Sequence, residues 1–132
     1  MKRLLLGLLA AVFLVGLSCD GGPTAGELDI HFSSPTNDDT AIRFVVTARS
    51  PALLEEVSAA CTGCQVFSRK VSDSEIRVIL LGTLATGTVA RVTVSDTRAT
   101  SAYTLTLQEV AGSDLGIYPP STRRLEFGPA PR

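Results

Sequence analysis

Residues 27–33 have the sequence ELDIHFS, in which Leu28, Ile30 and Phe32 alternate with polar side chains. A period of two places the apolar residues on one face of a β-strand and the polar residues on the other. We therefore predict a strand with one buried face and one solvated face. His31 falls on the solvated face, and we interpret it as a surface histidine rather than a general base.

Similar β-like runs recur along the rest of the chain. Further strands are predicted at 42–47, 66–71, 76–81, 89–94, 103–110 and 125–127. Turn-forming residues separate many of these runs, beginning with residues 35–39, at intervals near the roughly 8 to 12 residues expected of a β-sandwich. We predict an all-β fold, a single small antiparallel β-sandwich of about seven strands, over residues 27–128.

Two segments allow more than one interpretation. Residues 51–60 place Leu53, Leu54, Val57 and Ala60 at helical spacing, but we favour a strand or a loop there. Residues 76–81 are apolar on both faces towards their end, which is typical of an interior strand or a covered patch. A surface that binds a partner is the alternative for the second segment.

Residues 1–18 have the features of a signal peptide. Basic residues precede an apolar run over 4–17, and Ser18 and Cys19 follow it. These 14 apolar residues are too few for a membrane span, which takes roughly 20 helical residues. The sequence VGLSC at 15–19 resembles a lipobox, with Gly where Leu is usual. We predict a cleaved signal helix and lipid on Cys19; secretion without lipid is the alternative.

The remaining segments complete the predicted domain organisation. Residues 19–26 are rich in glycine and are predicted to be a flexible tether, and residues 129–132 a disordered tail. The mature protein would be exported and anchored by lipid on a bacterial membrane, at the periplasmic face or the cell surface. Asp20 resembles the inner-membrane retention signal of bacteria related to the enterics, and the choice of membrane stays open.

Charge and aromatic content disfavour two classes of ligand. The signal holds two of the 12 basic residues and none of the 13 acidic ones, so the mature chain has a formal charge near −3. We expect no nucleic-acid partner, because such a partner requires a basic patch. The chain has no Trp and two tyrosines, Tyr103 and Tyr118. Carbohydrate is therefore less favoured than protein, since sugar sites usually rely on exposed aromatic platforms.

No catalytic, metal or cofactor site is predicted. The chain has a single histidine and no Gly-x-Ser-x-Gly motif, so the set of catalytic residues that a serine hydrolase uses is not visible. Two free thiols and one histidine are too few for a four-ligand zinc site. Glu55 and Glu56 are neighbours that would point to opposite faces of a strand, so we do not infer the paired carboxylates of a glycosidase from them. Residues 37–39 are predicted to form a solvated turn rather than a calcium loop.

The motif Cys61-Thr62-Gly63-Cys64 could carry redox chemistry. In an exported chain two thiols this close normally oxidise to each other. A redox-active pair requires a helix N-terminus to lower the thiol pKa, whereas this motif lies between predicted strands with Gly63 suited to a turn. We predict a structural disulfide; a redox pair, metal binding and free thiols are the alternatives.

The order of elements resembles a shortened cohesin-like β-sandwich over residues 27–115. The resemblance lies in the Gly-rich turn and strand at 82–94 and in the Ala-Gly-Ser-Asp run at 111–114. The chain also resembles small uncharacterised bacterial lipoproteins in residues 101–103 and 108–111. A cohesin resemblance implies a protein-binding module, and it assigns no binding residues here.

The predicted function is therefore a non-catalytic binding or structural module of the cell envelope, with an envelope protein as its partner. The alternative is a small thiol-redox or other enzyme that uses Cys61 and Cys64.

Overall fold

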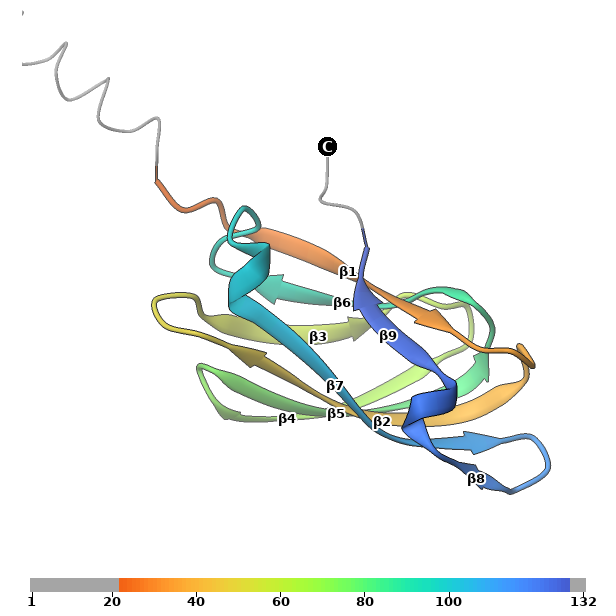
Figure 1. Cartoon of the computed structure of the whole chain (residues 1–132). Coiled ribbons are helices and arrows are strands. Elements are labelled where there is room, and N and C mark those ends of the chain that lie inside the picture. The colour runs from red at the N-terminus through yellow and green to blue at the C-terminus, as the bar shows by residue number, and fades with distance from the viewer. Residues whose placement is uncertain (1–21, 129–132) are drawn as a thin grey trace, which may run out of the picture.

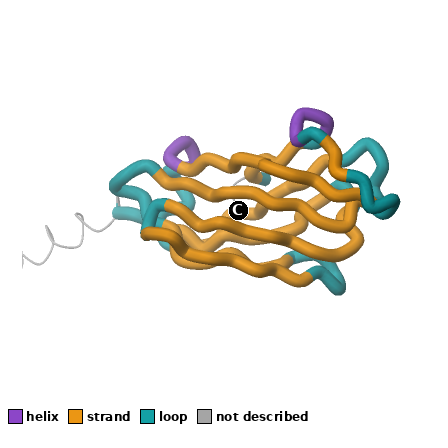
Figure 2. Tube along the Cα trace, turned by 90° about the horizontal axis from the view of Figure 1, so that it is seen from below, coloured by secondary structure: helices purple, strands orange, loops and turns teal. Residues whose placement is uncertain are grey.

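The computed structural model describes residues 22–128 and shows a two-layered β-sandwich (Figure 1). The predicted signal peptide, the lipid site at Cys19 and the tail at 129–132 lie outside the described residues. Loops gather at the two ends of the sandwich (Figure 2). We call the end where β1 (Gly26–Ser33) begins the near end, and the end where it finishes the far end.

Both sheets are antiparallel throughout, which confirms the predicted fold. Sheet A contains, in spatial order, β3 (Leu54–Ala59), β6 (Gly87–Val94), β1 and β9 (Arg124–Phe127). Sheet B contains β4 (Gln65–Ser72), β5 (Glu75–Leu84), β2 (Asp39–Ala48), β7 (Tyr103–Gly112) and β8 (Ile117–Tyr118). Two short 3-10 turns, η1 (Thr100–Ala102) and η2 (Pro120–Thr122), lie in the connections that precede β7 and β9.

Residues 22–128 thus form nine strands, two more than the seven predicted. One of these two, β8, has two residues, too few to show a period. The other, β3, lies in the segment for which strand or loop was favoured. A register shift between Leu54 and Glu56 lets both Leu54 and Val57 reach the core, which produces the helix-like spacing. Because of this bulge Glu55 and Glu56 are both exposed, and the prediction that they occupy opposite faces of a regular strand is wrong.

The core lies between the inner faces of the two sheets. The alternation predicted for residues 27–33 and 42–47 is confirmed, because Leu28, Ile30, Phe32, Ile42, Phe44 and Val46 are all buried. The segment 76–81 contributes Ile76, Val78 and Leu80 to the same core. Burial of each such side chain contributes about 1.5–3 kcal/mol, so the packed inner faces supply most of the driving force for folding.

Tyr103 fixes the crossover from sheet A to sheet B at the near end. Its hydroxyl donates a hydrogen bond to the Asp96 carbonyl oxygen at 2.8 Å and accepts one from the Asp96 N–H at 3.2 Å. Its ring packs edge to face on Phe127, with ring centroids 6.4 Å apart. Bonding of this kind, from a buried tyrosine to backbone a few residues upstream, closes a corner in other β-sandwiches. Tyr103 is therefore a buried framework residue and not a sugar platform.

The interior position predicted for residues 76–81 is confirmed, because β5 lies between β4 and β2. The idea that the apolar residues on its second face are covered is wrong. Ile79 and Leu81 point away from the core and are exposed, since no other described segment packs over this side of sheet B.

Candidate functional site

The two outer faces of the sandwich differ in chemistry. The outer face of sheet A is polar, with Glu27, Asp29, His31, Arg91, Thr93 and Glu126 along its strands. Asp29 pairs with Arg91 at 3.0 Å, and a His31 ring nitrogen lies 2.8 Å from the Thr88 hydroxyl. His31 thus has an ordinary surface partner, which fits its interpretation as a surface histidine.

The outer face of sheet B instead carries large apolar side chains. Four of the seven exposed large apolar residues in the described chain lie on it: Phe67 (56% exposed), Ile79 (44%), Leu81 (38%) and Ile117 (68%). Single exposed apolar residues are normal on protein surfaces, whereas a contiguous group marks an interaction site. We call this surface the sheet B face.

Strand pairing makes the apolar residues contiguous. Leu81 lies opposite Ala41 in β2, Ala41 opposite Ala111 in β7, and Ala111 opposite Ile117 in β8. This row crosses sheet B at the far end. The next row towards the near end places Phe67 opposite Ile79, and Ile79 opposite Arg43.

Arginines occupy the middle of the sheet B face. Arg43 pairs with Glu109 at 2.9 Å, and Arg77 pairs with Glu75 at 3.1 Å. Arg69 lies directly opposite Arg77 on the neighbouring strand and has no carboxylate partner among residues 22–128. Like charges in this position destabilise a sheet unless an anion approaches them. The face therefore has one uncompensated positive charge beside its apolar rows.

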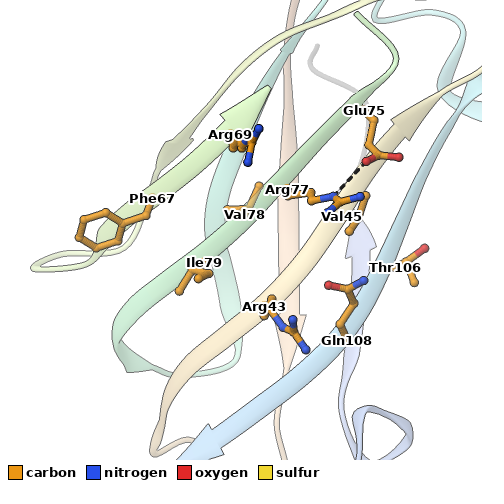
Figure 3. A pocket seen from close by; sticks show the side chains of 10 residues that line it. All are labelled: Arg43, Val45, Phe67, Arg69, Glu75, Arg77, Val78, Ile79, Thr106 and Gln108. Atoms are coloured by element: carbon orange, nitrogen blue, oxygen red, sulfur yellow. Dashed lines mark hydrogen bonds and ion pairs between the residues drawn. The ribbon is translucent and has the colours of Figure 1, made fainter. Parts of the chain in front are cut away.

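The sheet B face contains an open depression of about 670 Å³ (Figure 3). Arg43 and Val45 lie on β2, between Phe67, Arg69 and Arg77 on the β4 and β5 side and Thr106 and Gln108 on the β7 side. The lining residues offer apolar area and guanidinium donors, and they include no histidine, cysteine or unpaired carboxylate. Such a surface suits binding better than acid–base or nucleophilic chemistry.

A buried ion pair at the far end is the main feature that sequence reasoning missed. Arg123 binds Asp39 through two parallel hydrogen bonds, Nε to Oδ2 at 3.0 Å and Nη2 to Oδ1 at 2.8 Å. The Asp39 and Arg123 side chains are 0% and 4% exposed. The prediction of a solvated turn is wrong for Asp39, because Arg123 folds back over it from 84 residues further along the chain. Asp38 is exposed, as that prediction requires.

The same arginine organises the hairpin between β7 and β8. Its guanidinium lies 4.5 Å from the centre of the Tyr118 ring, and the Tyr118 hydroxyl donates to Asp114 at 2.6 Å. The other Asp114 oxygen accepts the Gly116 N–H at 3.0 Å. The hydrogen bond from Tyr118 lowers the pKa of Asp114, and the same bond raises the pKa of the Tyr118 phenol.

We assign this far-end cluster a structural role. Burial alone would raise the pKa of Asp39, but the hydrogen bonds and charge of Arg123, with hydrogen bonds from Ser34 and Thr36, hold it below the ordinary value of 3.8. Every buried side-chain nitrogen and oxygen in residues 22–128 has a hydrogen-bond partner. The buried polar atoms of the ion pair therefore all have partners within the chain.

Cys61 and Cys64 form the predicted disulfide, with their Cα atoms 5.4 Å apart. Gly63 adopts the left-handed conformation expected of the turn, with φ near +75°. Gly82 lies against the bridge at a φ of +150°, where a Cβ would come within 2.9 Å of the Cys64 sulfur. The described residues place no helix N-terminus at Cys61, so the feature that activates a redox cysteine is missing there.

Comparison with known proteins finds no matching family, no similar curated protein and no similar solved structure. The resemblance to cohesins and to small bacterial lipoproteins therefore stays a prediction. Within residues 22–128 no three His, Cys, Asp or Glu side chains are grouped so that they could hold a metal ion. In the same part of the chain, no helix has the length and apolar character to cross a membrane.

We predict that Asp39→Asn lowers the free energy of unfolding by about 3–5 kcal/mol at pH 7, because it leaves the Arg123 charge buried and unpaired. Asp38→Asn, at the exposed neighbouring position, is the matched control and should cost far less. Urea unfolding followed by circular dichroism measures both changes.

The same pair should make stability depend on pH in acid. The pKa of Asp39 is lower in the folded than in the unfolded chain, so its contribution is complete above about pH 4 and is lost as the pH falls through the folded value. The stability gap between wild type and Asp39→Asn should therefore narrow below about pH 4. A gap that stays constant down to about pH 2 would contradict this assignment.

Proposed function

We propose that this protein is an exported lipoprotein, held on a bacterial membrane by lipid on Cys19, that binds an envelope protein through the sheet B face without catalysing a reaction. The observation that carries the binding role is the contrast between the two outer faces. Exposed large apolar residues gather beside an unpaired arginine on sheet B, whereas the matching face of sheet A is polar.

The chemistry of the sheet B face favours a protein ligand. Its apolar rows offer the area that a protein partner can dehydrate, and arginine is enriched at the centres of protein interfaces. Phe67 is the one aromatic side chain lining the depression, so the stacked platform of a sugar site is missing among the described residues. Three arginines and two carboxylates give the face a small net positive charge, far less than a nucleic-acid surface carries.

The membrane part of the proposal rests on the signal and lipobox patterns. Cys19 stands seven residues before β1 begins at Gly26. A short tether would hold the near end towards the membrane and the far end away from it. The sheet B face would then stand to the side of the sandwich, open to a protein in the same membrane.

Anchoring can be tested at the predicted lipid site. We expect Cys19→Ser to abolish incorporation of labelled palmitate and to move the protein from the membrane to the soluble or unprocessed fraction, because several acyl chains are needed for firm anchoring. The double variant Cys61→Ser, Cys64→Ser is the control and should keep its lipid. Wild-type protein that takes up no label would overturn the anchoring proposal.

Binding can be tested by photo-cross-linking in intact cells. A photoreactive residue at Ile79 should cross-link to a defined protein, whereas one at Ser58, exposed on the outer side of sheet A, should not. Charge reversal by Arg69→Glu should weaken the cross-link from Ile79, and the same reversal at Arg124 in sheet A should not. Equal cross-linking from Ile79 and Ser58 would exclude a dedicated binding face on sheet B.

A further inference from the structure

The four edges of the two sheets are protected to different degrees. In sheet A, β3 is interrupted by a bulge and carries two exposed glutamates, and β9 has four residues. In sheet B, β8 has two residues and pairs only with Val110 and Ala111 of β7. Within the described chain, residues 103–109 of β7 also lack a strand on that side, but a bulge interrupts the pairing of β7 with β2. The remaining edge, β4, has eight residues, of which Gln65–Lys70 pair regularly with β5. Long regular edges present unpaired backbone groups that can accept another strand.

Most side chains of the β4 edge are exposed to solvent. Seven of its eight residues are exposed and Val66 is half-buried. Within residues 22–128, β4 pairs with β5 and with no other strand. Its second row of backbone N–H and C=O groups therefore has no strand partner in this range, because such groups point alternately to both sides of a strand.

The side chains beside this edge set a pattern for an incoming strand. On the sheet B face, Phe67 and Arg69 lie two residues apart, next to Ile79 and Arg77 of β5. A strand added along β4 would place its own outward residues beside Phe67 and Arg69, again two positions apart. An apolar residue fits beside Phe67, and a carboxylate fits beside Arg69, where it would also relieve the repulsion between Arg69 and Arg77.

We infer that the partner supplies an extended acidic segment that adds to sheet B as a further strand along β4. This inference rests on the proposed function and names its mode of recognition. Backbone hydrogen bonds to β4 give affinity, and an apolar residue two positions away from an Asp or Glu gives specificity, in the order that the direction of the added strand sets. The added strand would widen the sheet B face and cover Phe67.

Charge argues against a second copy of this chain pairing through the same strand. Two β4 strands paired in register would bring Arg69 and Lys70 of one copy beside the same residues of the other, and a two-fold pairing centred on Arg69 would oppose the two Arg69 side chains. Like charges across strands are destabilising. Lys70 is on the opposite face of β4 from Arg69 and pairs with Asp73 at 3.2 Å. Cationic side chains on both faces of this edge thus favour an acidic strand.

The test uses the full lipidated protein in detergent micelles and a synthetic peptide. The peptide has eight residues, with threonine on one face and alternating valine and glutamate on the other. We expect titration to slow hydrogen exchange at alternate amides of residues 65–70 by at least tenfold. The Arg69→Glu variant should weaken binding roughly tenfold, whereas Arg124→Glu should leave it unchanged. A peptide with lysine in place of glutamate should not bind.

The outcomes separate this inference from the proposed function. A peptide that changes the NMR chemical shifts of Phe67 and Ile79 without protecting the β4 amides would lie on the sheet B face. That result would overturn strand addition alone. Absence of binding would also overturn strand addition, while cross-linking from Ile79 tests the face independently. Protected β4 amides in a dimer that forms without peptide would show a second copy as the occupant and overturn the acidic partner.

Discussion

Each sheet of this sandwich can bury one face, and that constraint organises the rest of the structure. Leu28, Ile30 and Phe32 of sheet A pack towards Ile42, Phe44 and their neighbours in sheet B, so the opposite face of each sheet remains in water. A solvated face is expected to be polar, and that of sheet A is. The solvated face of sheet B departs from this expectation, since it displays a contiguous apolar group around arginines.

The Asp39–Arg123 ion pair stabilises the fold and also helps to position part of the sheet B face. Removing two charges from water is costly, and the cost is offset here by two short parallel hydrogen bonds and by complete pairing of the buried polar atoms. The pair joins the start of β2 in sheet B to the segment that leads into β9 in sheet A. Through Tyr118 it also holds β8, which places Ile117 at the end of the apolar row.

Local pattern was sufficient to predict much of the fold, because side-chain alternation depends on near neighbours. The seven predicted strands, the interior position of residues 76–81 and the Cys61–Cys64 disulfide all follow from residues close in sequence. The bulge in β3 made the strand resemble a helix in sequence. One inserted residue changes the spacing between its buried residues from two to three.

Contacts between distant residues could not be predicted in the same way. Nothing local pairs Asp39 with Arg123, because the strand order that brings them together depends on the whole sandwich. The same holds for the row of Phe67, Ile79 and Arg43, which exists only once the register of three strands is known. One local signal did indicate the apolar surface of sheet B. Residues 76–81 are apolar on both faces, whereas a strand with one solvated face needs apolar residues on its buried face alone.

The most direct test of the central claim compares the protein in its own membrane with the same protein purified in micelles. Hydroxyl-radical footprinting reports the exposure of Phe67, Ile79 and Leu81 in both states, with exposed Leu53 in the loop before β3 as the reference. If a partner covers the sheet B face, oxidation of the three residues falls several-fold in the membrane while Leu53 is unchanged. Equal oxidation of all four residues in both states would contradict the account.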